Sequence, residues 1–294
     1  MSQTILADAC RQVGIGASHA EPIHLGENDI YRLEGGVVAR IAQAGQSSAA
    51  GREVEVARWL QRNDIAAVEP LPDVTQPVDG SDGNGTTRPV TFWRELPDHI
   101  DGSYPDMATV LVHLHSLAVP DFLLPLTPFV RLDERIDEAV TLSPDDRRWL
   151  QGHLVELKGR YADLPAGRPD CVLHGDAHNG NIAHTSDGRS MLLDLERVAV
   201  GPPEWDLMLA AFNHDSVGWL DDVGYRAFCE RYGYDVRDSP RYKLLRNIRE
   251  FRKALFAAQQ AGSDPALTDQ AAHRVACLRG NQGQRPWRNW HPLE

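Results

Sequence analysis

The hydrophobic pattern of this 294-residue chain changes at Pro97, and that change constrains the fold more than any other feature. Before it, short β-branched and aromatic segments such as Val37–Ile41 and Pro89–Leu96 are separated by turns rich in Gly and Pro. Ser47–Arg62 interrupts these segments with apolar residues at helical spacing. The first part of the chain is therefore expected to form an antiparallel sheet with one main helix.

Beyond this point helical spacing dominates. Ser143, followed by a proline and two acids, is a strong helix start, because the serine can cap the first N–H groups and the acids oppose the helix dipole. Further helical patterns cover Met107–Leu117, Tyr242–Gln260 and Pro265–Arg279. Two brief apolar strands, Cys171–Leu173 and Met191–Leu195, stand among them. We expect an α+β fold of two lobes, a small N-terminal lobe over residues 1–96 and a larger, mostly helical lobe over residues 97–294.

The composition excludes several classes of protein. Acids outnumber bases by 42 to 30, which gives a net charge of −12 and disfavours nucleic acid or an anionic membrane as a partner. The four cysteines are scattered, without a CxxC pair, which fits a reducing cytosol better than a disulfide framework or a zinc site. The sequence has no secretory signal and no apolar run of membrane-spanning length, so a cytoplasmic location is expected.

A polar loop between the two brief strands carries the residues with the clearest chemistry. The sequence there is VLHGDAHNGNI, and a second apolar segment, MLLDLE, follows shortly after it. Phosphoryl transfer needs one carboxylate beside the attacking hydroxyl, together with a second carboxylate and an amide oxygen that hold Mg²⁺ against the phosphates. Asp176, Asn181 and Asp194 provide this set of groups.

VLHGDAHNGNI resembles the catalytic loop of the aminoglycoside phosphotransferase superfamily, whose fold is similar to that of protein kinases. LLDLERVAVGPPEWDLM resembles the metal-binding segment of that superfamily. Upstream, ENDIYRLEGGVVARI is similar to its nucleotide-loop hairpin, GREVEVARWL to the helix that follows, and TFWRELPD to its hinge strand. The resemblance covers about residues 20–210 and implies a bilobal kinase-like fold that uses ATP and Mg²⁺.

The resemblance also implies roles for single residues. Asp176 matches the catalytic aspartate, which orients the acceptor hydroxyl and takes its proton late in the reaction. Asn181 and Asp194 match the Mg²⁺ ligands. His174 is expected to be structural, and Asp206 matches a position that supports the catalytic loop.

The phosphate-binding position departs from the protein-kinase pattern. Arg40 stands where a lysine is usual, and no lysine precedes Lys158. A guanidinium can bind phosphate through two parallel hydrogen bonds, so Arg40 can do this work. The resemblance implies that Glu53 rather than Glu55 is its partner, and helical periodicity supports this choice by placing Glu53 on the apolar face of its helix. No GxGxxG motif is present, and the loop at residues 26–29 is the one segment in the right place.

The hinge strand supplies the remaining nucleotide contacts. Trp93 is expected at the back of an adenine pocket, with main-chain groups of Arg94 and Leu96 facing the adenine edge; a core position would explain Trp93 equally well. His113 and His115, on an apolar helix, are expected in the core or between the lobes.

These expectations describe an ATP-dependent kinase that phosphorylates a hydroxyl of a small molecule, with two open classes of acceptor. One is an aminoglycoside-like or other cationic natural product, which would make the protein an antibiotic-resistance or self-resistance enzyme. The other is an amino sugar or amino alcohol of metabolism. Acidic residues of the second lobe could attract a cation: Glu204, Asp215, Asp221, Asp222, Glu230 and Asp235.

Two other functions compete. A catalytically dead kinase-like module would explain the arginine at position 40, although Asp176, Asn181 and Asp194 are all present. A protein kinase is disfavoured, because the stretch from Asp194 to Gly201 is too short to dock a peptide.

Overall fold

The computed structural model describes residues 2–26 and 28–293. Its contacts divide the chain into two compact units. The first unit contains the chain up to Asp106 together with Asn179–Val198, and the second contains Met107–His178 and the chain from Ala199 onward. The sequence-based division at residues 96 and 97 follows the chain linearly and stays a prediction, whereas the contacts group a later segment with the first unit.

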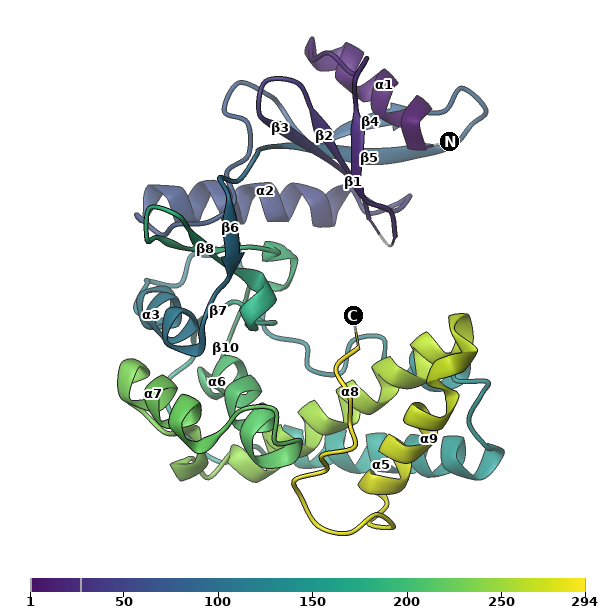
Figure 1. Ribbon diagram of the computed structural model, residues 1–294, viewed down its shortest axis with the longest axis vertical. Coiled ribbons are helices and arrows are strands. Elements are labelled where there is room, and N and C mark those ends of the chain that lie inside the picture. Colours follow the sequence, from purple (N-terminus) through teal and green to yellow (C-terminus); the bar gives the residue numbers. More distant parts are fainter. Residues whose placement is uncertain (1, 27, 294) are drawn as a thin grey trace. The chain divides into compact units, whose positions relative to one another are not determined.

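An antiparallel sheet with the strand order β1-β2-β3-β5-β4 forms the centre of the first unit (Figure 1). The strands are β1 (Glu21–His24), β2 (Asp29–Leu33), β3 (Val37–Ile41), β4 (Val78–Ser81) and β5 (Thr87–Arg94). Gly35 and Gly36 join β2 to β3 with φ angles of 79° and 70°, a left-handed conformation that glycine adopts without a steric penalty. The hairpin expected at this pair is therefore present.

Strand alternation gives this sheet two different faces. On one face, Ala39, Ile41 and Phe92 pack against helix α1 (Ser2–Val13), which contributes Ile5, Leu6, Ala9 and Cys10 to the same core. Residues on the other face alternate with these and point toward helix α2 (Ser47–Arg62). Arg40 and Trp93 belong to this second face, so the pleat itself turns them away from the α1 core.

A smaller sheet with the order β6-β8-β9 completes the first unit. Its strands are β6 (His99–Asp101), β8 (Ile182–Thr185) and β9 (Ser190–Leu192). Two of these strands come from the later segment, which explains why that segment groups with the N-terminal residues. The second strand expected at Met191–Leu195 ends earlier than predicted, because a short 3₁₀ turn (Leu195–Arg197) takes over.

Helices make up most of the second unit (Figure 1). They are α3 (Tyr104–His115), whose first residues belong to the first unit, α4 (Leu132–Glu138), α5 (Pro144–Ala162), α6 (Glu204–Ala211), α7 (Asp222–Tyr232), α8 (Tyr242–Ser263) and α9 (Thr268–Leu278). Shorter turns lie at Asn179–Asn181 of the first unit and at Phe212–Ser216, Val236–Asp238 and Pro265–Leu267 of the second. The strands β7 (Cys171–Leu173) and β10 (Ala199–Gly201) pair with each other. The predicted fold class, a small antiparallel sheet followed by a larger helical part, is confirmed.

Local signals explain where the long helices begin. The Ser143 hydroxyl accepts a hydrogen bond of 3.0 Å from the Asp146 N–H, so it caps α5 as expected.

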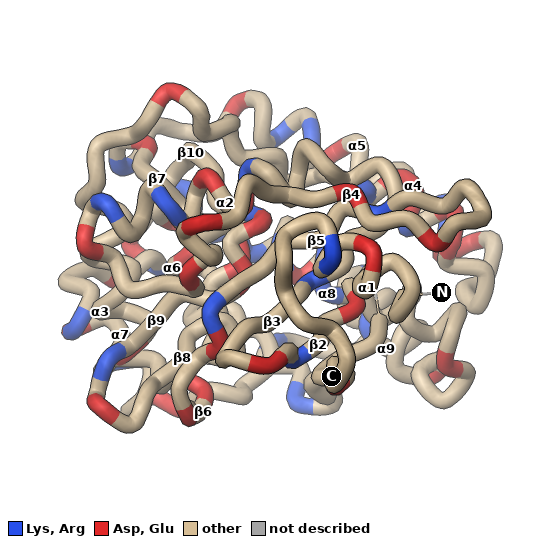
Figure 2. Tube along the Cα trace, turned by 90° about the horizontal axis from the view of Figure 1, so that it is seen from above, with Lys and Arg blue, Asp and Glu red and all other residues tan. Residues whose placement is uncertain are grey.

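Figure 2 shows acidic and basic residues interspersed along the chain, so the net charge of −12 is not a property of one tail. Among the described helices, none combines the length and the apolar character needed to cross a membrane.

Candidate active site

The first unit contains a cavity of about 670 Å³. Six residues singled out from the sequence line it: Arg40, Glu53, Trp93, Arg94, Leu96 and Asp194. They come from β3, α2, β5 and the end of the β8–β9 hairpin, segments that are far apart in the sequence. The fold therefore brings the expected nucleotide residues and one expected metal ligand to a single cavity.

Arg40 lies among three carboxylates. Its Nη1 is 2.5 Å from Glu53 Oε1, its Nη2 is 3.1 Å from Glu196 Oε2, and Asp194 Oδ1 lies at 4.0 Å. Glu55 is exposed, so the expected choice of Glu53 agrees with the structure. Burial opposes the charge of Arg40, but these carboxylates raise its pKa overall.

Glu53 is almost completely buried, with 6% of its surface exposed. Burial raises the pKa of Glu53 to about 7, against the lowering influence of Arg40. A buried carboxylate that holds a guanidinium at 2.5 Å fixes the direction in which that guanidinium points. Glu53 thus positions Arg40 at the cavity wall.

Two main-chain N–H groups at the end of β5 are already engaged within the first unit. The Arg94 N–H donates to the Glu69 carbonyl at 2.8 Å, so it is already used within the unit. The Glu95 N–H donates to the Gly36 carbonyl, also at 2.8 Å. Among the described residues, no backbone hydrogen bond engages the Leu96 N–H, and Leu96 lines the cavity. Trp93 is buried and its Nε1 donates to Thr91 Oγ1, so it is also a core residue.

Hairpin register brings the two expected metal ligands together. Ile182 pairs with Leu192, and the Leu193 N–H donates to the Asn181 carbonyl at 2.9 Å. Asn181 therefore stands immediately before β8, and Asp194 stands just beyond the end of β9, at the same end of the hairpin. The two residues lie at the same end of the hairpin because antiparallel strands place the start of one beside the end of the other.

The surroundings of Asp194 fit a divalent cation. Its φ of 48° is a left-handed conformation that is costly for a residue other than glycine. Its Oδ1 is buried and accepts no hydrogen bond from the described residues, although Arg40 lies within ion-pair distance. A carboxylate and an amide oxygen suit Mg²⁺, which takes few protein ligands when it also binds phosphates. In the described part of the chain, no group of three or more His, Cys, Asp or Glu could hold a metal by itself.

In the second unit, the loop after β7 presents Asp176. Gly175 has a φ of 85°, which turns the chain sharply at this point. Asp206 holds the turn, because its carboxylate accepts hydrogen bonds from the N–H groups of His174 at 2.7 Å and Gly175 at 2.9 Å. The side chain of Asp176 is 28% exposed, so it remains accessible to a substrate.

Asp206 is itself completely buried and well satisfied. His115 Nε2 lies 3.1 Å from its Oδ2. Burial opposes the charge, yet the hydrogen bond from His115 and the nearby His174 lower the pKa of Asp206 below its usual value. His174 is buried, as its expected structural role requires. The side chain of His115 is buried in the second unit, as expected. His113 is exposed on α3, so of the two positions expected for it, the core position is wrong.

Two residues near Asp176 were not foreseen. Trp205 donates from Nε1 to the Gly175 carbonyl at 2.9 Å, so α6 holds the loop that carries Asp176 through two neighbouring residues, Trp205 and Asp206. Arg249 of α8 places its Nη1 3.4 Å from Asp176 Oδ1 and its Nη2 3.2 Å from the Trp205 carbonyl. Its guanidinium also lies over the Trp205 ring, 4.9 Å from the centroid. The helical spacing predicted the helix that carries Arg249. It did not predict the contact with Asp176, because 73 positions separate the two residues.

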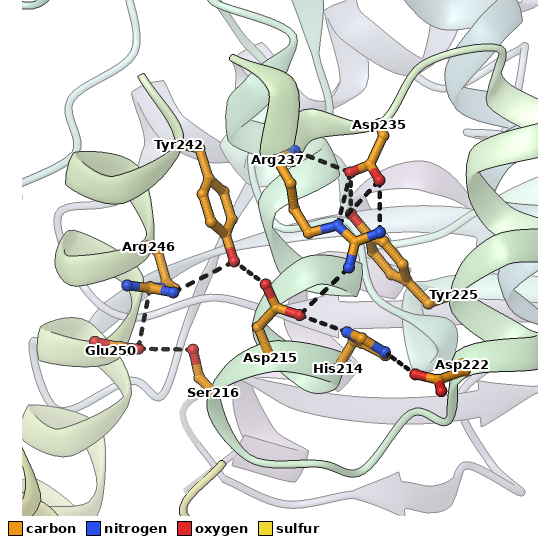
Figure 3. Close-up of polar contacts among 10 residues, drawn as sticks. All are labelled: His214, Asp215, Ser216, Asp222, Tyr225, Asp235, Arg237, Tyr242, Arg246 and Glu250. Carbon is orange, nitrogen blue, oxygen red and sulfur yellow. Dashed lines mark hydrogen bonds and ion pairs between the residues drawn. The ribbon is translucent and has the colours of Figure 1, made fainter. Parts of the chain in front are cut away.

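The acidic residues expected to attract a cationic ligand are engaged elsewhere. Figure 3 shows Asp215 between His214, Arg237 and Tyr242, with Asp235 bound to Arg237. Three further members are also engaged: Asp222 contacts His214, Asp221 caps α7, and Glu204 is buried and contacts Arg241 and Ser239. Glu230, the sixth, is exposed on α7. Most of these carboxylates therefore make contacts within the second unit.

The chain is similar in sequence to one protein family and in fold to several solved structures. A sequence model described as "Phosphotransferase enzyme family" matches residues 19–245. No curated protein matches this chain in sequence. Solved structures with a similar fold share little sequence with it, so they are informative about the fold alone.

Three of these structures illustrate the kinds of protein that share the fold. An aminoglycoside phosphotransferase, APH(3'')-Id from Streptomyces rimosus, is 20% identical, with 84% of this chain and 96% of that chain covered and a TM-score of 0.61. The amicoumacin kinase hAmiN is 11% identical, with 89% of each chain covered and a TM-score of 0.66. A choline/ethanolamine kinase family protein from Mesorhizobium loti is 18% identical, with 94% of this chain and 93% of that chain covered and a TM-score of 0.60. The kinase-like fold and the resemblance noted in the sequence are confirmed.

Proposed function

Because the chain belongs to the phosphotransferase enzyme family, we propose that it transfers the γ-phosphoryl group of ATP to a hydroxyl of a small molecule. One observation carries this proposal. Arg40 is held by the buried Glu53 in the wall of a cavity that Asp194 also lines. A positioned guanidinium beside a carboxylate suited to Mg²⁺ is the arrangement that phosphate groups require.

In this proposal, each residue has one task. Arg40 binds phosphate oxygens, Leu96 donates its N–H to the base, and Asn181 and Asp194 hold Mg²⁺, which neutralises phosphate charge when bound. Asp176 accepts a hydrogen bond from the acceptor hydroxyl. The hydroxyl oxygen attacks the γ-phosphorus as the bond to the ADP oxygen breaks, and the hydroxyl proton passes to Asp176.

The class of acceptor rests on weaker support. Among the solved structures, one aminoglycoside phosphotransferase binds streptomycin and another protein is a choline kinase, and both of these substrates are cations. A cationic natural product, which would imply antibiotic resistance or self-resistance, is therefore our first candidate, and an amino sugar or amino alcohol is the alternative. Internal pairing of the acidic residues removes the argument that charge in the second unit had offered for a cation.

A dead kinase-like module receives no support from the cavity. Arg40 is held in place, and Asp194 keeps an oxygen without a hydrogen bond among the described residues.

ATP consumption over a panel of hydroxyl compounds tests the proposal. The panel should include aminoglycosides, amino sugars and amino alcohols, and the phosphorylated product should be identified by mass. We expect transfer to at least one acceptor with the unchanged protein and its loss with Asp176→Asn. Nucleotide binding without transfer to any acceptor would favour the dead module instead.

A further inference from the structure

One face of α8 carries a row of basic side chains toward the catalytic loop. Arg246, Arg249 and Lys253 follow each other at intervals of three and four residues, so they lie one above the other on the helix. Arg249 is buried and contacts Asp176. Lys253 stands one turn further on the same face, close enough for the charge of Asp176 to act on its ammonium.

The two ends of this row differ in how their charge is neutralised. Arg246 lies 3.7 Å from Glu250, the carboxylate drawn beside it in Figure 3. Glu250 also binds Arg285 at 2.6 Å. Near Lys253, by contrast, no hydrogen bond or ion pair joins the ammonium to another described residue.

The charges that act on Lys253 are predominantly positive. After burial, the largest influences on the Lys253 ammonium come from one carboxylate, Asp176, and from three arginines, Arg249, Arg274 and Arg252. Arg274 comes from α9 and donates to the Lys253 carbonyl at 3.0 Å. Burial, followed by these arginines, lowers the pKa of Lys253 to about 8, although Asp176 opposes the change. A half-buried lysine in such surroundings is stabilised by a negative group from outside the chain.

We propose that Lys253 binds an anionic group, a phosphate or a carboxylate, next to Asp176, while Arg249 holds the Asp176 carboxylate in position. This inference rests on the proposed kinase function, because that function places a reacting substrate at Asp176. Two sources can supply the anion. One is the phosphoryl group during its transfer, whose oxygens gain from a fixed cation. The other is a carboxylate or phosphate of the acceptor itself.

Three variants test the site. Lys253→Met removes the charge, Lys253→Arg keeps it, and Lys243→Met is a matched control, because Lys243 is an exposed lysine on the same helix. Melting temperatures show whether each variant folds. The first measurement is calorimetric titration with inorganic pyrophosphate, which needs no turnover. Loss of one charge-assisted contact should weaken this binding about 10-fold in Lys253→Met and leave it near normal in the other two variants.

Two further measurements assign the source. If the anion is the transferred phosphoryl group, Lys253→Met weakens binding of a non-hydrolysable ATP analogue but not of ADP, and the variant has a lower kcat. If the anion belongs to the acceptor, the unchanged protein prefers a hydroxy acid to the corresponding amide. Lys253→Met then loses this preference because its KM for the hydroxy acid rises. Equal pyrophosphate affinity in the unchanged protein and Lys253→Met overturns the inference. Failure of the kinase proposal is seen separately, as absence of transfer by the unchanged protein.

Discussion

The surroundings of Arg40 and of Asp176 are opposite in charge. In the first unit, one guanidinium faces the three carboxylates of Glu53, Asp194 and Glu196. In the second unit, the Asp176 carboxylate contacts the buried Arg249, and its charge acts on Lys253. Buried groups of one sign in excess cost free energy unless a ligand of the other sign joins them.

The difference indicates what each region is built to receive. Excess carboxylate around Arg40 suits a divalent cation that arrives with a nucleotide, because the metal adds positive charge where the chain lacks it. Excess positive charge around Asp176 suits the negative phosphoryl group or an anionic acceptor. Each of these two local groups would be stabilised by a reactant of the opposite charge.

Removal of the carboxylate from the second region should have the largest effect. Asp176→Asn keeps the shape of the side chain but can no longer accept the hydroxyl proton. We expect kcat to fall by at least about 10²-fold. Steady-state kinetics with a saturating acceptor measures this, and unchanged turnover would remove Asp176 from the reaction.

The support of the catalytic loop should be next in size. Asp206→Asn leaves an amide where two backbone N–H groups and His115 now meet a carboxylate. One buried donor then loses its partner, at a cost of about 3 kcal/mol in the free energy of unfolding. Chemical denaturation measures the loss. A change below the error of the method would mean that the loop is held mainly by Trp205.

The position of Arg40 should depend on the charge of Glu53. Glu53→Gln keeps the packing but weakens the contact to the guanidinium, so we expect the KM for ATP to rise about 10-fold. Glu55→Gln, on the exposed side of the same helix, is the control and should behave like the unchanged protein. An equal rise of the KM for ATP in the two variants would contradict the pairing of Arg40 with Glu53.

The smallest expected effect concerns stability and pH. The lowered pKa of Lys253 means that the folded protein binds fewer protons than the unfolded chain between about pH 8 and the ordinary lysine value. Its charge therefore costs stability below about pH 8, and the cost disappears as the pH rises. Lys253→Met should be more stable at pH 7, by about 1 kcal/mol, and the advantage should shrink toward pH 10. A stability advantage of Lys253→Met that grows with pH would contradict the lowered pKa of Lys253.

Local patterns and the family resemblance were enough to predict much of the first region. The resemblance, together with helical periodicity along α2, predicted that Arg40 pairs with Glu53. The motif spacing predicted a loop that presents Asp176 between short strands. These features depend on neighbours within one or two elements, which a sequence displays directly.

The remainder depends on contacts that the sequence does not display. Arg249 reaches Asp176 across 73 positions, and nothing in its own surroundings distinguishes it from other helical arginines. Asp215 and Asp235 could be read as a patch for cations only because their partners were not known. The helix α4 was missed, because its seven residues are too few for a periodic pattern to be evident.

Nucleotide binding by the two aspartate variants tests the contrast between the regions most directly. Calorimetry should compare ATP binding, with and without Mg²⁺, to Asp194→Asn and Asp176→Asn. The account predicts that Asp194→Asn loses the gain in affinity that Mg²⁺ provides, about 10-fold or more, whereas Asp176→Asn keeps it. Loss of this gain in both variants, or in neither, would contradict the assignment of the metal to the first region and of the acceptor to the second.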